Sequence, residues 1–253
     1  MEKKAFNYNL ADSQGTIVKP IEPKLFDFVK YQEYEAGQLE QNRKFWSGDA
    51  GVAVYRRFRA PEVFSYGCKD MKQSLALQLG ALNKSISYKM DVANFLEPWY
   101  GIGTIGSAFG LTYEWHENQA PATKAAFKNV KEAVAYPVTA VDKTDIGRHT
   151  LEMIEYFMDQ TKGKLPVSFT DTQSPLNIAA SLVDINQFFM DFYENPAELQ
   201  QLLDLITDLL IDFTKKQREL IGDALALPGH GFSSSREFTG VGMSDDMMIM
   251  LSP

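Results

Sequence analysis

Short apolar segments alternate with long amphipathic stretches along most of this chain, and this alternation restricts the folds open to it. The clearest apolar segment covers residues 165–175, where LPVSFTDTQSP is apolar first and polar at its end. The clearest helix is predicted over residues 196–222, because leucine, isoleucine and phenylalanine recur there every three or four residues. Strands separated by helices of this length are typical of βαβ units and a parallel sheet. The alternation therefore predicts an α/β fold.

The boundaries of the long helix are also predicted. Asn195 suits the N-cap, Pro196 suits the first helical position, and Glu198 completes a capping box. Gly222 is expected to end the helix. Further helices are predicted over residues 25–46, 70–89 and 145–162, and further strands over residues 61–67, 90–98 and 110–115.

The number of strand–helix units sets the expected architecture. A chain of 253 residues matches the size of a (β/α)8 TIM barrel. The pattern contains about five strand–helix units, however, whereas a closed barrel needs eight. We therefore predict an incomplete barrel over residues 51–253, truncated on its C-terminal side, with an arm and a helix over residues 1–50 before it.

The charge of the chain excludes several classes of partner. There are 25 Lys and Arg against 33 Asp and Glu, a formal net charge of −8. Such a chain lacks the concentrated basic surface that nucleic acids and anionic membranes require. Cys68 is the only cysteine, so no intrachain disulfide and no multi-cysteine metal site can form. With no signal-peptide pattern and no apolar run of membrane-spanning length, we expect a cytoplasmic protein.

Polar side chains gather where predicted strands end, which is the ligand-binding side of a parallel α/β fold. Glu97 ends its segment beside Trp99 and Tyr100, so it is either a cation-binding or acid–base group, or a solvated loop carboxylate. Asp171 and Gln173 follow the clearest strand, where Asp171 could equally cap a turn. The residues expected to bind substrate are Arg59, Tyr100, His116, Asp171, Gln173, Asn177 and His230.

Two adjacent aspartates and the histidines complete the candidates. Asp245 and Asp246 follow a short apolar segment, where they could bind a metal, share a proton or cap the next helix. His116 and His230 follow strand-like segments and could carry a proton, whereas His149 is expected on the surface. None of the histidines has the spacing of a metal-binding pair, so no metal ligand is assigned.

The segment YGIGTIG places Gly101, Gly103 and Gly106 in the GxGxxG pattern of a dinucleotide-binding turn. Pro98 separates the preceding strand from the first glycine, and no good helix follows at once. A glycine-rich loop at the mouth of a sheet is therefore favoured over a nicotinamide or flavin site. Cys68 has no convincing histidine partner, which favours a packed thiol over a nucleophile.

Three stretches of the chain resemble the uroporphyrinogen decarboxylase superfamily. DTQSPLNIAASLVDINQFFMDFYENPAELQQLLDLITDLLIDF is similar to its central segment, in which a Gly/Ser-Pro turn and D-x-Y-x-x-P precede a long helix. MDVANFLEPWYGIGTIGSAFG is similar to the second strand of that family, and GVGMSDDMMIMLSP to a later strand end that reads D-x-x-x-x-x-L/I-S-P. The resemblance covers roughly residues 60–253.

The resemblance implies a (β/α)8 barrel and one of two activities. One is cofactor-free decarboxylation of the acetate side chains of uroporphyrinogen. The other is zinc-dependent methyl transfer that involves a corrinoid protein and a thiol such as coenzyme M. The zinc ligands of the methyltransferases, and a late histidine of the decarboxylases, are implied to lie beyond residue 253 of this chain.

The decarboxylases hold substrate carboxylates with an R-Q-A-G-R-Y motif. The corresponding region here is RRFRAPEVFSYG, with arginines at Arg56, Arg57 and Arg59 but without that motif. Where the decarboxylases have an aspartate after the second strand and a tyrosine after the proline turn, this chain has Glu97 and Ser181.

Three hypotheses follow for a protein with a small-molecule substrate. The first is a corrinoid-dependent methyltransferase-like protein in which Glu97, Asp245 and Asp246 are the candidate catalytic residues and a corrinoid protein is the partner. The second is a tetrapyrrole decarboxylase, whose anionic substrate would need the arginines at the mouth of the pocket. The third is a catalytically inactive barrel whose open sheet edge pairs with a second copy or another chain.

Overall fold

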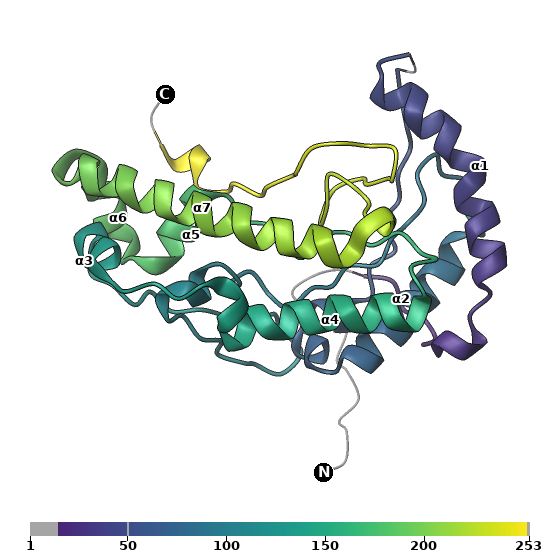
Figure 1. The fold of residues 1–253 in the computed structure, drawn as a ribbon, viewed down its shortest axis with the longest axis horizontal. Helices are drawn as coiled ribbons and strands as arrows, with labels where there is room; N and C mark the ends of the chain where they lie inside the picture. The colour runs from purple at the N-terminus through teal and green to yellow at the C-terminus, as the bar shows by residue number, and fades with distance from the viewer. Residues whose placement is uncertain (1–14, 50, 252–253) are drawn as a thin grey trace, which may run out of the picture.

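The structure is a computed structural model that describes residues 15–49 and 51–251 (Figure 1). The expected N-terminal arm therefore lies partly outside the described residues. The described part contains seven α-helices. They are α1 (Phe28–Trp46), α2 (Met71–Ser85), α3 (Val130–Ala135), α4 (Asp145–Thr161), α5 (Pro175–Leu182), α6 (Ile185–Glu194) and α7 (Pro196–Ile221). The four predicted helices are confirmed as α1, α2, α4 and α7, while α3, α5 and α6 had not been predicted.

Helix α7 begins at Pro196 and ends at Ile221, and the C-cap Gly222 has the positive φ of 56° that favours glycine. The predicted capping box is wrong, because the Asn195 side chain makes no capping hydrogen bond. Its amide donates instead to Asp191 Oδ1 (2.6 Å), and the Val130 backbone N–H donates to Asp191 Oδ2 (2.8 Å). Asp191 is fully buried, and a buried carboxylate needs hydrogen-bond donors more than an accessible helix end needs a cap.

Three extended segments lie side by side and in parallel. Leu96 pairs with Val167, and Val167 pairs with Leu225. The Leu96 backbone N–H donates to Pro166 O (2.8 Å), and that of Ala226 donates to Val167 O (2.9 Å). Helical connections join these segments, as parallel pairing requires. Each β contact among the described residues is a single bridge, so the predicted strands are present only as short extended segments.

The strand predicted over residues 61–67 is wrong. Two 3₁₀-helices, Pro61–Phe64 and Tyr66–Lys69, occupy this stretch. Pro61 has no N–H to give to a sheet and suits the first position of a helical turn. The Ser65 hydroxyl donates to Glu62 O (2.9 Å) and so satisfies one carbonyl of that turn locally.

The stretch over residues 110–115, expected as a strand, contributes a single antiparallel bridge between Glu114 and Ala122. The parallel segments and their helical connections agree with an α/β arrangement. The incomplete (β/α)8 barrel and the division of the chain at residue 50 stay predictions.

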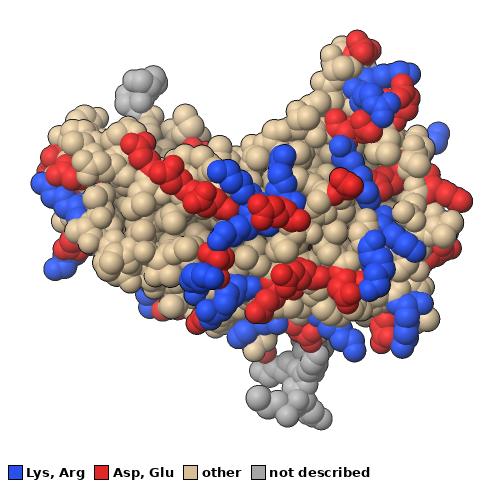
Figure 2. Space-filling model, in the orientation of Figure 1, with Lys and Arg blue, Asp and Glu red and all other residues tan. Residues whose placement is uncertain are grey.

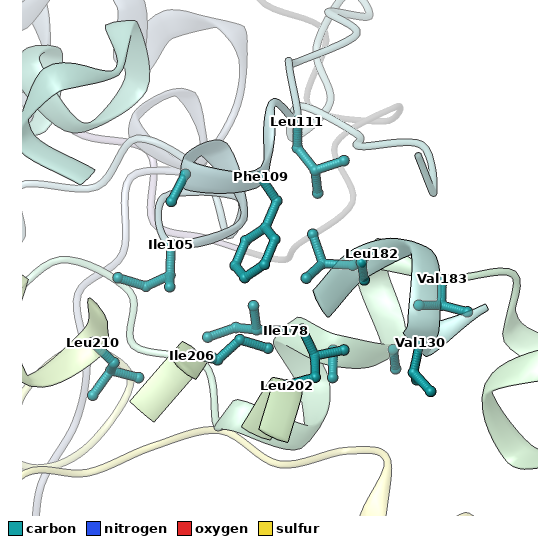
Figure 3. Packing of buried hydrophobic residues seen from close by; sticks show 14 of the residues in the cluster. Ile105, Phe109, Leu111, Val130, Ile178, Leu182, Val183, Leu202, Ile206 and Leu210 are labelled. Carbon is teal, nitrogen blue, oxygen red and sulfur yellow. The ribbon is translucent and has the colours of Figure 1, made fainter. Parts of the chain in front are cut away.

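Helix α7 runs across the molecule and packs on α3, α4 and α5 (Figure 1). Its Leu202 and Ile206 are fully buried, and Figure 3 shows them grouped with Ile178 of α5 and Phe109. A second core lies where α1, α2 and α4 meet the parallel segments, and it includes Tyr31, Leu75, Leu79, Leu96, Met153 and Val167. Burial of apolar side chains in these two cores fixes where the extended segments end.

Helix α1 stands crosswise at one end of the molecule, where the segment that follows α7 turns back (Figure 1). Figure 2 shows basic and acidic side chains interspersed on the visible face rather than gathered into one patch of a single sign. None of the helices in the described ranges is long and apolar enough to cross a membrane.

We expect Leu202→Ala to lower the free energy of unfolding by about 2–5 kcal/mol, because it leaves a cavity in a packed core. Ile211→Ala on the same helix is the control, since Ile211 is 42% exposed. That variant should lose less than about 1 kcal/mol. Urea denaturation followed by circular dichroism measures both, and equal losses would contradict the position of this core.

Candidate functional site

His230 lies between two carboxylates at the ends of the parallel segments. Its Nδ1 is 3.3 Å from Glu97 Oε1, and its Nε2 is 3.2 Å from Asp171 Oδ2. The three side chains are only 9%, 8% and 13% exposed. Glu97 follows the Leu96 bridge, whereas Asp171 and His230 follow the other two segments. The structure therefore brings together three residues that the sequence had placed at strand ends, and we call them the His230 cluster.

Glu97 is held on both its side chain and its backbone. Arg57 Nη2 donates to Oε1 (2.5 Å) and Arg57 Nε donates to Oε2 (3.2 Å), a two-pronged ion pair. Gln78 of α2 accepts from the Glu97 backbone N–H (2.7 Å) and donates to its carbonyl oxygen (2.9 Å). These contacts leave Glu97 one orientation, toward His230.

Asp171 begins a chain of side-chain hydrogen bonds. Trp99 Nε1 donates to Asp171 Oδ2 (3.0 Å), and Gln173 Nε2 donates to Asp171 Oδ1 (2.9 Å). Asn177 Nδ2 donates in turn to Gln173 Oε1 (3.0 Å), and Asn177 Oδ1 accepts from the Met247 backbone N–H (3.0 Å). Gln173 and Asn177 thus support Asp171 and anchor the end of the described chain.

The charges of the cluster reinforce one another. Burial would raise the pKa of Glu97, but the positive charges of His230 and Arg57 lower it to about 2. Burial would likewise raise the pKa of Asp171, and the hydrogen bond and charge of His230 lower it to about 2. Burial alone would lower the pKa of His230, yet the charge of Glu97 and the contact with Asp171 raise it above its ordinary value. The cluster therefore favours the protonated form of His230 between two carboxylates.

Arg59 adds a cation that no described carboxylate pairs. Its guanidinium carbon lies 3.8 Å from the centroid of the Phe64 ring, and its buried Nε has no hydrogen-bond partner. Burial and the charge of Arg57 lower the pKa of Arg59 to about 10, so it stays protonated at neutral pH. Three cations (Arg57, Arg59 and His230) stand against the two carboxylates, which leaves an excess of one positive charge.

Asp245, Asp246 and His116 have no described contact with His230. Asp245 Oδ1 accepts from the Met248 backbone N–H (3.3 Å) and so caps a short turn. Asp246 and His116 are exposed. A chemical role for Asp245, Asp246 and His116 stays a prediction.

Tyr100 lies three residues after Glu97 but faces a different partner. Its ring stacks on His149 with 3.8 Å between the centroids, and burial raises the pKa of Tyr100 to about 12. The expectation that His149 lies on the surface is wrong, because α4 turns it inward, where its Nε2 is buried without a hydrogen-bond partner. Burial lowers the pKa of His149. Tyr100, Tyr113, Trp115 and the first turn of α4 line an open cleft of about 470 Å³.

The absence of side chains at Gly101 and Gly103 leaves room for the Tyr113 side chain. A Cβ on Gly103 would lie 2.8 Å from the Tyr113 ring. A Cβ on Gly101 would lie 2.7 Å from the Tyr113 hydroxyl, and Gly101 also has a positive φ of 82°. The Gly103 backbone N–H donates to that hydroxyl (2.8 Å). The helix that follows, Gly106–Phe109, is a single 3₁₀ turn. These contacts agree with the favoured interpretation of a glycine-rich loop.

The residues present do not fit a zinc ion. No three His, Cys, Asp or Glu side chains within residues 15–49 and 51–251 are arranged to hold a metal. Both nitrogens of His230 face carboxylates, and an imidazolium offers no lone pair to a metal. Burial raises the pKa of the Cys68 thiol, so it does not offer a thiolate.

Two residues that contact the cluster were missed or undervalued in the sequence analysis. Arg57 was considered only together with Arg56 and Arg59, as arginines at the mouth of a decarboxylase pocket, and Gln78 was not considered at all. Gln78 does carry a signal, because it lies on the same helical stripe as Leu75 and Leu82 and is therefore a polar residue on an apolar face. No local pattern singles out Arg57 from its neighbours Arg56 and Arg59.

A family model described as uroporphyrinogen decarboxylase (URO-D) matches residues 50–237, a stretch that contains the whole His230 cluster. The chain belongs to the uroporphyrinogen decarboxylase family. This confirms the resemblance found in the sequence. Helix α1 precedes the part of the chain that matches the uroporphyrinogen decarboxylase family.

Other comparisons are more distant. A methyltransferase from Methanosarcina mazei is similar to this member of the uroporphyrinogen decarboxylase family, with 19% sequence identity and a TM-score of 0.43. The similarity covers 49% of this chain and 37% of that methyltransferase, so the chain spans well under half of its length. No curated protein matches this chain.

We expect His230 to titrate above an ordinary histidine and His149 below one, and Asp171→Asn to lower the pKa of His230 by about one unit or more. The raised pKa of His230 stabilises the fold below the unfolded-state value, and this contribution is lost as the pH rises through the folded-state value. NMR titration of the imidazole protons measures these pKa values. The control is Asp159→Asn, which removes an exposed carboxylate paired with Lys162.

Proposed function

We propose that the His230 cluster binds a carboxylate-bearing small molecule and that His230 donates a proton to it during decarboxylation. The observation that carries this proposal is the position of His230 between the carboxylates of Glu97 and Asp171, which favours its protonated form, beside an arginine without a carboxylate partner. Membership in the uroporphyrinogen decarboxylase family supports a small-molecule substrate and this class of reaction.

Arg59 is the proposed binding group. A guanidinium presents donors in a planar fork that matches a carboxylate, and the buried, unpaired Nε of Arg59 favours an anionic ligand. The excess positive charge around the cluster also favours the binding of an anionic ligand. Arg57 is less available, since two of its three guanidinium nitrogens already contact Glu97.

His230 is the proposed proton donor. In decarboxylation the bond between the carboxylate and its neighbouring carbon breaks, carbon dioxide leaves, and the electron pair stays on that carbon. The carbon then takes a proton, and the imidazolium becomes a neutral imidazole that solvent reprotonates. His230 Nδ1 makes no well-aligned hydrogen bond, so its proton is the less constrained of the two. Asp171, on the other nitrogen, would hold the ring in position.

The two other hypotheses gain less support from the geometry. Methyl transfer to a thiol, with zinc and a corrinoid protein, stays a prediction, and zinc calorimetry on the protein tests it. Association through an open sheet edge is not favoured at Leu227, because its backbone N–H and carbonyl pair with Ser235 (3.0 and 2.9 Å). A homodimer formed in some other way also stays a prediction.

We expect Arg59→Ala to raise KM about tenfold or more, because it removes a charge-assisted contact with the substrate carboxylate. We expect His230→Gln to lower kcat by about 10²–10⁴, the usual contribution of a general acid. The assay measures carbon dioxide release from uroporphyrinogen and from a panel of smaller carboxylic acids.

Arg56→Ala is the matched control for Arg59→Ala. Arg56 is exposed and lies over the rings of Phe58 and Tyr88 rather than in the cluster, so its removal should leave KM nearly unchanged. If the wild-type protein releases no carbon dioxide from any of these acids, decarboxylation is wrong. If Arg59→Ala and Arg56→Ala give the same KM, Arg59 does not bind the carboxylate.

A further inference from the structure

Helix α1 contacts both chain segments that carry the central ion pair of the His230 cluster. One stripe of its side chains (Tyr31, Glu35, Gln38 and Asn42) follows the i, i+4, i+7, i+11 spacing of a single helix face. Tyr31, Glu35 and Asn42 of this stripe are buried, although two of them are polar. Buried polar side chains on a helix face indicate specific partners rather than apolar packing.

The first set of partners is the backbone that leads into Glu97. The Tyr31 hydroxyl donates to Asn94 O (2.5 Å), and Gln38 Nε2 donates to Met90 O (3.1 Å). Asn42 Nδ2 donates to the next carbonyl, that of Asp91. Three side chains of α1 thus hold the segment 90–94, which reaches Glu97 three residues later.

The second set of partners lies on the loop that follows His230. Arg236 Nε pairs with Glu35 Oε1 (2.9 Å), a carboxylate whose side chain is only 9% exposed. Arg43 contacts both carboxylate oxygens of Glu237 (3.0 and 2.8 Å). These two ion pairs hold the loop within seven residues of His230.

Aromatic contacts hold the same loop at the end of α1. The Trp46 ring stacks on Phe238 with 4.6 Å between the centroids, and Trp46 Nε1 donates to Thr239 Oγ1 (3.0 Å). Phe45 also contacts the Phe238 ring, at 6.1 Å between centroids. Phe238 itself is buried, so this end of the loop is packed rather than free.

We propose that α1 is a positioning helix that fixes Glu97 and His230 relative to each other, by binding the segment before the first and the loop after the second. A helix suits this role because each residue is hydrogen-bonded along the axis, which makes it stiff. The stretch that matches the family begins at residue 50, so these contacts come from outside it. The inference deepens the proposed function, but the arrangement that it describes can be measured without turnover.

The contacts differ in what they contribute. The pair between Glu35 and Arg236 is largely buried, so removing one partner leaves a charge that is poorly solvated. The Arg43 pair is more exposed, at 59% for the arginine side chain, and exposed pairs contribute little. Arg236 and Trp46 are therefore the positions at which the role of α1 is best tested.

The test measures the pKa of His230 by NMR in Arg236→Gln and in Trp46→Ala. The charged groups around His230 are Glu97, Asp171 and the neighbouring Arg57 and Arg59, and none of them is altered. If α1 sets the distance to Glu97, each variant lets His230 move away, and its pKa falls by about half a unit or more. Loss of the Arg236 charge alone would raise that pKa, so the two effects differ in sign.

Trp46→Ala removes no charge, and Trp46 is 43% exposed at the end of its helix, so this variant keeps the test valid if Arg236→Gln fails to fold. Arg236→Lys retains the charge, so the His230 pKa in this variant should lie closer to the wild-type value than it does in Arg236→Gln. Arg148→Gln is the matched control, because Arg148 pairs with exposed Asp145 on α4, and its His230 pKa should equal that of the wild type. A His230 pKa that is unchanged or raised in both test variants overturns the inference.

The inference and the proposed function fail in different ways. A lowered His230 pKa in both variants, without decarboxylation by the wild type, supports the positioning role and contradicts the proposed function. Decarboxylation by the wild type, with an unmoved His230 pKa in both variants, supports the function and contradicts the positioning role. If the positioning role and the proposed function are both correct, kcat in Trp46→Ala should fall about in proportion to the loss of protonated His230. KM should change less.

Discussion

The ion pairs of His230 with Glu97 and Asp171 are the interaction on which the rest of the site depends. Three charged groups are nearly buried, and each would be costly to remove from water alone. They are stable together because opposite charges lie beside one another, and because Arg57 and Trp99 donate further hydrogen bonds to the two carboxylates. The chain must therefore bring the ends of three extended segments to one place.

The two apolar cores make that arrangement possible. One packs α7 against α3 and α5, and the other packs α1, α2 and α4 beneath the paired segments. The cores fix the positions of the segments, but the side chains of a site of this kind must be placed to within about half an ångström. Polar contacts of α1 with both sides of the cluster supply this finer control, from a part of the chain that precedes the family match.

The long helices could be predicted because their signals are local. Apolar periodicity with a proline at one end and a glycine at the other is sufficient for α7, whatever packs on it. The strand predicted over residues 61–67 failed because apolar residues near a proline suit a buried 3₁₀ turn as well as a strand. Asn195 failed as a cap because a buried carboxylate, Asp191, competed for its side chain.

The sequence by itself determined the four predicted helices, the family and the polar residues at segment ends, because all of these depend on neighbours along the chain. Only the tertiary structure decided which of those polar residues meet. It joined Glu97, Asp171 and His230, turned His149 inward onto Tyr100, and left His116 exposed. Such contacts join residues far apart in sequence, and they follow from packing and charge pairing that no local pattern records.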